Sequence, residues 1–157
     1  MRKRPMSNLI IRAAVSADLP ILREFEQGII ATERPFNDCL KSEYICYYDI
    51  GALIDGESSS VMVAEEDGVI VGSGYARIKK SKAHLTHEFH AYLGFMYVAP
   101  THRGRGINQL IIQALINWGK SQGMQDFYLE AYADNNSALK AYEKLGFKTT
   151  LIEMKLS

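Results

Sequence analysis

The sequence predicts an α/β protein, and three observations support this fold class. Short segments of strand-like composition alternate along the chain with segments in which apolar residues recur at helical intervals. Asp67-Gly68 lies between two strand-like segments and is a typical turn of a β-hairpin. A glycine-rich stretch, residues 102–108, leads directly from a strand-like segment into a helical one.

Near the N-terminus we expect a strand and then a helix. The segment NLIIRAA, residues 8–14, is short and β-branched, and Ser16 and Asp18 behind it both suit a helix N-cap. Pro20 falls in the first turn of this helix, where its missing N–H costs little. One face of the helix is expected to be buried and to carry Ile21, Leu22, Phe25 and Ile29.

The next segment, residues 33–54, is mixed in composition. We expect a second, shorter helix in it, followed by a loop through residues 55–60. Cys39 and Cys46 lack the spacing of metal ligands, and two cysteines make no disulfide framework. We interpret both cysteines as packing residues in a helical region.

The middle of the sheet is predicted from a hairpin and a further strand. Residues 61–66 and 69–80 flank the Asp67-Gly68 turn and should pair in antiparallel fashion. The aromatic and apolar segment at residues 91–98 predicts another strand, and Pro100 helps to end it.

Behind the glycine-rich stretch the predicted order is helix, strand, helix, strand. The first helix begins near Gly106, and its buried face is expected to hold Ile107, Leu110, Ile111, Ala114, Leu115 and Trp118. Residues 126–133 predict a strand, and residues 135–146 predict a capped helix. Four side chains of that helix are expected to face inward: Ala138, Ala141, Tyr142 and Leu145. Residues 147–156 predict the final strand.

The composition is that of an ordinary globular protein. We expect the 157 residues to form one domain, because no linker or low-complexity tract divides them. The charges balance to a net charge of zero, which argues against a protein that coats nucleic acid or an anionic membrane. No apolar run is long enough to span a bilayer, and the basic start MRKRPMSN is not followed by the apolar stretch of a signal peptide. We therefore expect a cytoplasmic protein.

The stretch HRGRGIN, residues 102–108, has the composition of an anion site. A turn from a strand into a helix points several backbone N–H groups and the positive end of the helix dipole at one place, which attracts phosphate. Glycines let the backbone approach the anion closely, and Arg103 and Arg105 can add charge-assisted hydrogen bonds. Taken alone, the stretch could also be a solvated turn with two surface arginines.

Two motifs in this part of the chain resemble those of the GNAT superfamily of acyl-CoA-dependent N-acyltransferases. The family signature Arg/Gln-x-x-Gly-x-Gly/Ala corresponds to Arg103, Gly104, Arg105, Gly106, Ile107 and Asn108. A second family pattern, Asn-x-x-Ala-x-x-x-Tyr-x-x-x-Gly-Phe, matches Asn135, Ala138, Tyr142, Gly146 and Phe147. Asn108 stands where the family has a small residue, and we expect its amide to donate a further hydrogen bond to a pyrophosphate.

The resemblance covers essentially the whole chain and implies a GNAT fold. In that fold a mixed, mostly antiparallel central sheet splays between its fourth and fifth strands and is flanked by about four helices. The chain is too short for the family's usual pair of final strands, so we expect one continuous last strand. The resemblance also implies acetyl-CoA as co-substrate, no metal, and a homodimer from family habit. The residues that it assigns to acetyl-CoA are Met96, Tyr97, Val98, Arg103, Gly104, Arg105, Gly106, Ile107, Asn108, Asn135 and Tyr142.

Acetyl transfer to an amine needs a neutral amine, a stabilised oxyanion and a proton for the departing thiolate. In the family, backbone N–H groups of the fourth strand serve the thioester carbonyl, a role that falls here to residues 95–98. Gly94 stands where the family often has an acid, which rules out a carboxylate there. Glu130 lies in YLEAYADN, which resembles the Leu-Glu-Val strand of the ribosomal-protein N-acetyltransferase branch, and it precedes Tyr142 by twelve residues as in that branch. The resemblance therefore implies Glu130 as the base, with Glu88 and Glu33 as weaker candidates. The alternative for Glu130 is an outward-facing or salt-bridged carboxylate.

Tyr142 is the expected acid. A phenol with a reference pKa of ~10 can protonate a thiolate whose thiol has a pKa of ~8.5 only slightly uphill. Packing in the core is the alternative role for its ring, and the two roles are compatible. Asn135 is expected to hydrogen-bond the CoA arm, or else only to cap its helix.

The acceptor is expected to be a small-molecule or peptide amine, and Glu33, His90 and Tyr92 are the candidates for its pocket. A non-catalytic acyl-CoA sensor, which keeps the phosphate loop and loses the base, stays open as an alternative function. A nucleic-acid binder would use the arginines with Lys79, Lys80 and Lys82, and the zero net charge disfavours it.

Two further patterns fail as motifs. The run HLTHEFH, residues 84–90, lacks the His-Glu-x-x-His spacing of metalloproteases, so its histidines are interpreted as surface or acceptor-site residues. The triplet GKS, residues 119–121, lacks the first glycine of a nucleotide-binding P-loop.

Overall fold

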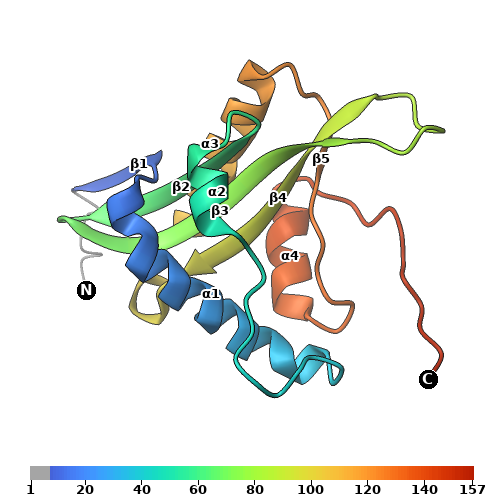
Figure 1. Cartoon of the computed structure of the whole chain (residues 1–157), viewed down its shortest axis with the longest axis horizontal. Helices are drawn as coiled ribbons and strands as arrows, with labels where there is room; N and C mark the ends of the chain where they lie inside the picture. Colours follow the sequence, from blue (N-terminus) through green and yellow to red (C-terminus); the bar gives the residue numbers. More distant parts are fainter. Residues whose placement is uncertain (1–7) are drawn as a thin grey trace.

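The structure is a computed structural model and describes residues 8–157; the basic segment at residues 1–7 lies outside the described residues. A single five-stranded sheet, in the order β1-β2-β3-β4-β5, forms its centre (Figure 1). The strands are β1 (Leu9–Ala13), β2 (Ser59–Glu66), β3 (Val69–Lys80), β4 (Phe89–Val98) and β5 (Phe127–Tyr128). All neighbours pair antiparallel except β4 and β5, which are parallel. The predicted mixed, mostly antiparallel sheet is therefore confirmed.

Four helices flank the sheet: α1 (Leu19–Glu33), α2 (Ile50–Asp55), α3 (Ile107–Ser121) and α4 (Asn136–Lys144). The side chains of α1 and α2 pack on one face, around Phe25, Ile50 and Phe95. The side chains of α3 and α4 pack on the other, around Ile111 and Leu115. Burying a side chain of this size stabilises the fold by about 1.5–3 kcal/mol, so each face holds a substantial core.

The expected faces of the helices are largely confirmed, with two errors. The four residues predicted to line α1 all pack in its core. In α3, however, Leu110 is exposed and Ile112 is buried instead, because the contact face is centred on the row Ile107–Ile111–Leu115. Ala141 of α4 is also exposed, since Tyr142 and Leu145 make that helix's contacts with the core.

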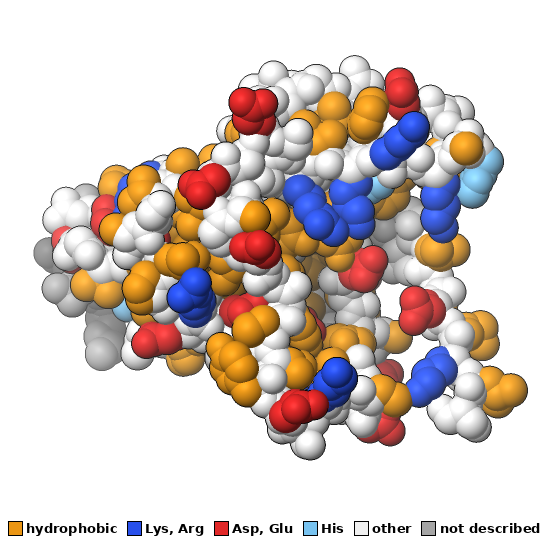
Figure 2. Space-filling view, in the orientation of Figure 1, with side chains coloured by type: hydrophobic (Ala, Val, Ile, Leu, Met, Phe, Trp, Pro, Cys, Tyr) orange, Lys and Arg blue, Asp and Glu red, His pale blue; other side chains and the backbone are white. Residues whose placement is uncertain are grey.

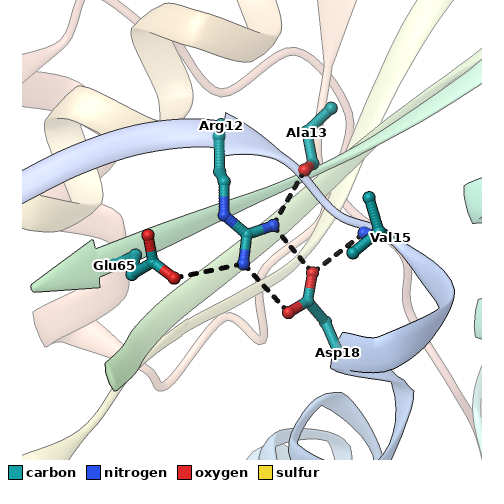
Figure 3. A network of polar contacts seen from close by, with 5 residues as sticks. All are labelled: Arg12, Ala13, Val15, Asp18 and Glu65. Atoms are coloured by element: carbon teal, nitrogen blue, oxygen red, sulfur yellow. Dashed lines mark hydrogen bonds and ion pairs between the residues drawn. The ribbon is translucent and has the colours of Figure 1, made fainter. Parts of the chain in front are cut away.

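The connection from β1 to α1 is held by an ion-pair network (Figure 3). Arg12 donates from Nη1 to Oδ2 of Asp18 over 2.8 Å and from Nη2 to Oδ1 over 3.0 Å, and it also meets Glu65 of β2. The backbone N–H of Val15 donates to the same Asp18 carboxylate. The Arg12 guanidinium lowers the pKa of Asp18. Asp18 is the N-cap residue of α1, as expected, but its carboxylate ties the helix to the sheet and does not cap the helix N–H groups, and no other side chain of residues 8–157 caps them.

The segment between α1 and α2 consists mostly of turns, bends and irregular backbone, and the prediction of a helical region around the two cysteines is wrong. After the short 3₁₀ turn Arg34–Phe36, the described chain is not helical again until α2 begins at Ile50. The buried carboxylate of Glu26 accepts from the backbone N–H groups of Tyr47 and Tyr48 over 2.9 and 2.8 Å. These bonds hold the end of the segment against α1. Both cysteines are exposed rather than packed.

Two predicted strands near the C-terminus are also wrong in extent. The strand expected at residues 126–133 is reduced to the two residues of β5, and residues 147–156 form no strand. A strand needs a partner edge for its backbone groups. Among the described residues β5 lies at the end of the sheet, and it is only two residues long, so it offers too short an edge for a strand of the predicted length. Leu151, Ile152, Met154 and Leu156 are accordingly exposed.

The strands β4 and β5 separate after a short contact. They pair only through Ala91 with Phe127 and Tyr92 with Tyr128, so the β5 side of residues 93–98 has no strand partner among the described residues. This is the splay that the family resemblance predicts. β4 also bulges, because Phe95 has a φ of 58° and the register with β3 shifts there.

Candidate active site

The glycine-rich loop brings the start of α3 to the end of β4. Gly104 and Gly106 have φ values of 77° and 78°, a left-handed conformation that favours glycine. Gly106 is the N-cap residue of α3, and no side chain among the described residues caps this helix end. The first N–H groups of the helix are therefore available to an external acceptor, and an anion is the acceptor that such a helix start favours.

The two arginines of the loop are held differently. Arg103 donates from Nε to the carbonyl oxygen of Val98 over 3.0 Å, which leaves its two terminal nitrogens free of hydrogen bonds within residues 8–157. Arg105 donates from Nη2 to Oε2 of Glu66 over 2.6 Å. The Nε2 of His102 lies 3.6 Å from Oε1 of the same carboxylate. The guanidinium that is free to meet a phosphate is thus that of Arg103, while Arg105 shares its charge with Glu66.

Several residues predicted to bind acetyl-CoA turn their side chains into the cores. Ile107 is buried against the sheet, and Met96 and Val98 pack on the α3 side of the sheet. Tyr97 packs on the α1 side, with its ring 4.6 Å from that of Phe25. These four residues can offer a ligand mainly their backbone groups, whereas Asn108 at the first turn of α3 is partly exposed.

Tyr142 is a residue of α4. Its ring packs with the α3-side core and lies 6.1 Å from the ring of Phe147. Burial, with a smaller contribution from the Glu33 carboxylate at the end of α1, raises the pKa of Tyr142 to about 12. The phenol is therefore protonated near neutral pH. Its hydroxyl lies within electrostatic range of a carboxylate that belongs to the other face of the sheet.

Asn135 caps α4. Its Oδ1 accepts from the backbone N–H of Ala138 over 3.2 Å. The capping role left open by the sequence is thus present, and the side-chain N–H groups of Asn135 remain free to donate elsewhere.

A cavity of about 520 Å³ opens on the α1 and α2 side of the sheet, where Figure 2 shows a hollow with basic and acidic side chains around it. Its floor comes from β3 and β4, one wall from the segment before α2 and from α2 itself, and another from the segment after β5. The lining residues are Tyr47, Tyr48, Asp49, Ala52, Leu53, Tyr75, Arg77, Lys79, Tyr92 and Glu130. Two predicted site residues, Glu130 and Tyr92, are brought together here.

The other acceptor candidates lie outside this lining. Glu33 is connected to the cavity by the lining residue Tyr47, whose hydroxyl donates to Oε2 of Glu33 over 3.1 Å. Burial raises the pKa of the Glu33 carboxyl above its ordinary value. His90 is not part of the cavity. Its Nδ1 lies 2.8 Å from Oγ of Ser81, and its ring packs 4.8 Å from that of Tyr128.

Sequence reasoning missed most of the cavity, including Arg77 and every lining tyrosine other than Tyr92. A usable signal was present on β3. Tyr75, Arg77 and Lys79 alternate along the strand, so they share a face of the sheet, and Tyr75 is already in the α1-side core.

Neither a metal-binding cluster nor a membrane-spanning helix is found in the part of the chain that the structure describes. No group of three or more His, Cys, Asp or Glu side chains within residues 8–157 could hold a metal ion. No helix in the same range is long and apolar enough to cross a bilayer.

Comparison with known proteins places these features in a family. Residues 23–147, which are most of the chain, match the acetyltransferase (GNAT) family. The chain therefore belongs to the GNAT acetyltransferase family.

Relatives and solved structures agree with this assignment. N-alpha-acetyltransferase 40 of Saccharomyces cerevisiae is 31% identical over an alignment of 111 residues that covers 66% of this chain and 35% of that protein. N-alpha-acetyltransferase 30 of Schizosaccharomyces pombe is 33% identical over 72 residues, 46% of this chain and 48% of that protein. The chain thus spans about a third to a half of the length of these relatives. A tetramutant of the BH1408 protein from Bacillus halodurans has the same fold, with a TM-score of 0.82, 25% identity, and coverage of 94% of this chain and 99% of that chain.

Proposed function

We propose that the chain is an acetyl-CoA-dependent N-acetyltransferase that transfers an acetyl group to a primary amine by direct attack. One observation carries this proposal: β4 joins the two halves of the site. Tyr92 of β4 lines the cavity, while Val98 leads into the loop before α3. The strand edge between them has no partner on the β5 side within the described chain. Six residues of strand span roughly 20 Å, a length of the order of an extended pantetheine arm.

In this proposal the loop binds the pyrophosphate. The first N–H groups of α3, the left-handed backbone at Gly104 and Gly106, and the free nitrogens of Arg103 support this assignment. Asn108 would add its side-chain amide. The free backbone edge of Met96 to Val98 would hold the arm, with the Asn135 amide as a further donor.

In the transfer step the lone pair of a neutral amine forms a bond to the acetyl carbon and the carbon–sulfur bond breaks. One amine proton goes to a base, and the CoA thiolate gains a proton. The products are the N-acetyl amine and CoA. Backbone N–H groups of residues 95–98 are assigned to the oxyanion.

We assign the acid to Tyr142. Since its pKa is raised to about 12, the hydroxyl keeps its proton at neutral pH and can donate a hydrogen bond to the thiolate as charge develops on sulfur. Complete proton transfer to a thiolate with a thiol pKa of ~8.5 is uphill, so stabilisation of the developing charge is the larger part of this role.

Two carboxylates are candidates for the base. Glu130 lines the cavity and is our first assignment. Glu33 is supported by a different observation, because burial raises its pKa and a general base is most effective when its pKa approaches the working pH. Glu33 would act through Tyr47, whose hydroxyl donates to it.

The proposal is tested by adding acetyl-CoA to the purified chain and measuring both the melting temperature and free thiol release with a mixed panel of primary amines. We expect a thermal shift that grows with ligand concentration and thiol release that depends on an amine. No shift at millimolar acetyl-CoA would contradict the proposal, and a shift without release from any amine would favour the sensor alternative. Action as one domain over residues 1–157, a cytoplasmic location and a homodimer remain predictions from the sequence.

A further inference from the structure

Two cations on β3 face the cavity without a carboxylate partner. Arg77 and Lys79 follow Tyr75 at alternate positions, so all three side chains lie on the α1 side of the sheet. Within residues 8–157, no carboxylate oxygen comes within 4.0 Å of either cationic group. Arg12 and Arg105, by contrast, are each paired with an acid.

The ring of Tyr92 supports both cations. The Lys79 Nζ lies 4.6 Å from the ring centroid and the Arg77 Cζ lies 5.9 Å from it, within the range of cation–π contacts. Arg77 is directly opposite Tyr92 in the β3–β4 register. A ring stabilises a cation without neutralising it, so the two positive charges remain available to an anionic group in the cavity.

The acidic side of the cavity is smaller. Asp49 is occupied in capping α2, where its Oδ1 accepts from the backbone N–H of Ala52 over 3.1 Å. Glu130 is the other carboxylate of the lining. Its charge and the charge of Arg77 both act on the hydroxyls of Tyr75 and Tyr92. Burial raises the pKa values of Tyr75 and Tyr92; the Glu130 carboxylate raises both further, while Arg77 lowers both. The carboxylate and the guanidinium thus lie near one pair of tyrosines.

We infer that the acceptor is a small amine that also carries a carboxylate, as an α-amino acid does. Arg77 and Lys79 would bind its carboxylate by charge-assisted hydrogen bonds, and the amine would lie on the Glu130 side of Tyr92. This inference rests on the proposed transferase function. A polycationic amine is disfavoured, because the like charges of Arg77 and Lys79 would repel it.

The test compares amines that share a side chain, with and without the carboxylate. Because the carboxamide also lowers the pKa of the α-amine, kcat/KM is calculated on the concentration of the neutral amine. Turnover with acetyl-CoA is measured by thiol release for a set of L-amino acids, including leucine and phenylalanine, and for the corresponding α-carboxamides. The polyamine spermidine serves as the polycation. We expect kcat/KM for the acids to exceed that for their amides by roughly ten- to a hundred-fold, the value of a hydrogen bond to a charged group.

Variants locate the effect. Arg77→Gln and Lys79→Gln should each raise KM for the acids by roughly ten-fold or more and leave the amides unchanged. The matched control is Lys80→Gln, which removes the same charge from the next residue of β3, on the opposite face of the sheet. Lys80→Gln should change KM neither for the acids nor for the amides.

Failure of this inference can be told apart from failure of the proposed function. If amides or spermidine react as well as the acids, or if Lys80→Gln has the same effect as Arg77→Gln, the carboxylate assignment is overturned while the transferase stands. If no amine reacts at all, equilibrium binding of N-acetyl-L-leucine and its amide with CoA present decides the question. Equal affinity for the two overturns the inference, whereas preference for the acid that is lost in Arg77→Gln supports a carboxylate subsite.

Discussion

The loop before α3 and the cavity on the other side of the site are built on opposite principles. The loop is one contiguous stretch, residues 102–108, that offers mainly backbone groups in a conformation fixed by two glycines. The cavity gathers side chains from several separate parts of the chain. Backbone donors suit a ligand part that never varies, such as a pyrophosphate, whereas scattered side chains can be exchanged one at a time. If the loop binds the cofactor and the cavity the acceptor, as we propose, the two kinds of recognition should be separable by mutation.

The largest effect is expected from Gly106→Val. The left-handed backbone at this position disfavours a β-branched residue, so the loop must change conformation. Losing two hydrogen bonds to phosphate, at about 1.5–3 kcal/mol each, would weaken acetyl-CoA binding roughly a thousand-fold. Isothermal titration with acetyl-CoA measures this loss.

Gly68→Val is the matched control. Gly68 has a φ of 82°, and a Cβ added at either glycine would meet no atom within 4 Å, so the two variants carry the same backbone strain without a clash. The control should lose comparable stability and keep its affinity. Equal affinity in Gly106→Val and the wild type would show that the phosphates bind elsewhere.

Tyr142→Phe should produce the next largest effect. The ring keeps its packing while the hydroxyl is lost, so kcat should fall roughly ten- to a thousand-fold while acetyl-CoA affinity and Tm hardly change. Tyr128→Phe is the control, because its hydroxyl pairs with His87 just before β4. Unchanged kcat in Tyr142→Phe, with chemistry rate-limiting, would remove the hydroxyl from the mechanism.

A smaller effect, roughly ten-fold and so below the usual range for a general base, is expected from Glu130→Gln, and a parallel Glu33→Gln variant separates the two candidate bases. A base acts when deprotonated, so if Glu33 is the base, kcat/KM falls as the pH drops through its raised pKa. Glu33→Gln then removes that limb of the profile. If Glu130 is the base, only Glu130→Gln lowers kcat/KM, most at low pH where few amines are neutral.

The stability of Glu33→Gln gives an internal check. Because the pKa of Glu33 is raised in the folded chain, its contribution to stability is present at low pH and is lost as the pH rises through that pKa. Glutamine keeps an acceptor for the Tyr47 hydroxyl and carries no charge. Loss of activity without loss of Tm at neutral pH would therefore report on chemistry rather than on folding.

The same difference explains what could be predicted from the sequence. The loop was predictable because its glycines, arginines and helix start are adjacent in the chain. The hairpin at Asp67-Gly68 and the α1 face were predictable for the same reason, since both depend on local conformation and periodicity.

The cavity and the C-terminal segment depend on contacts that no local pattern encodes. Arg77 looks like any exposed strand residue until the segment before α2 is laid along α1 by Glu26. Residues 147–156 have the composition of a strand, but a strand forms only where an edge accepts it, and pairing at β5 is limited to two residues. The composition of residues 147–156 cannot show that this edge is so short.

The most direct test is a crystal structure of the chain with acetyl-CoA. We expect the pyrophosphate at the N-terminus of α3, within hydrogen-bond distance of backbone N–H groups of the loop. We also expect the thioester in the splay, with its sulfur beside the Tyr142 hydroxyl and its carbonyl at the free edge of β4. Pyrophosphate bound elsewhere, or a thioester that does not enter the splay between β4 and β5, would contradict the proposed mechanism.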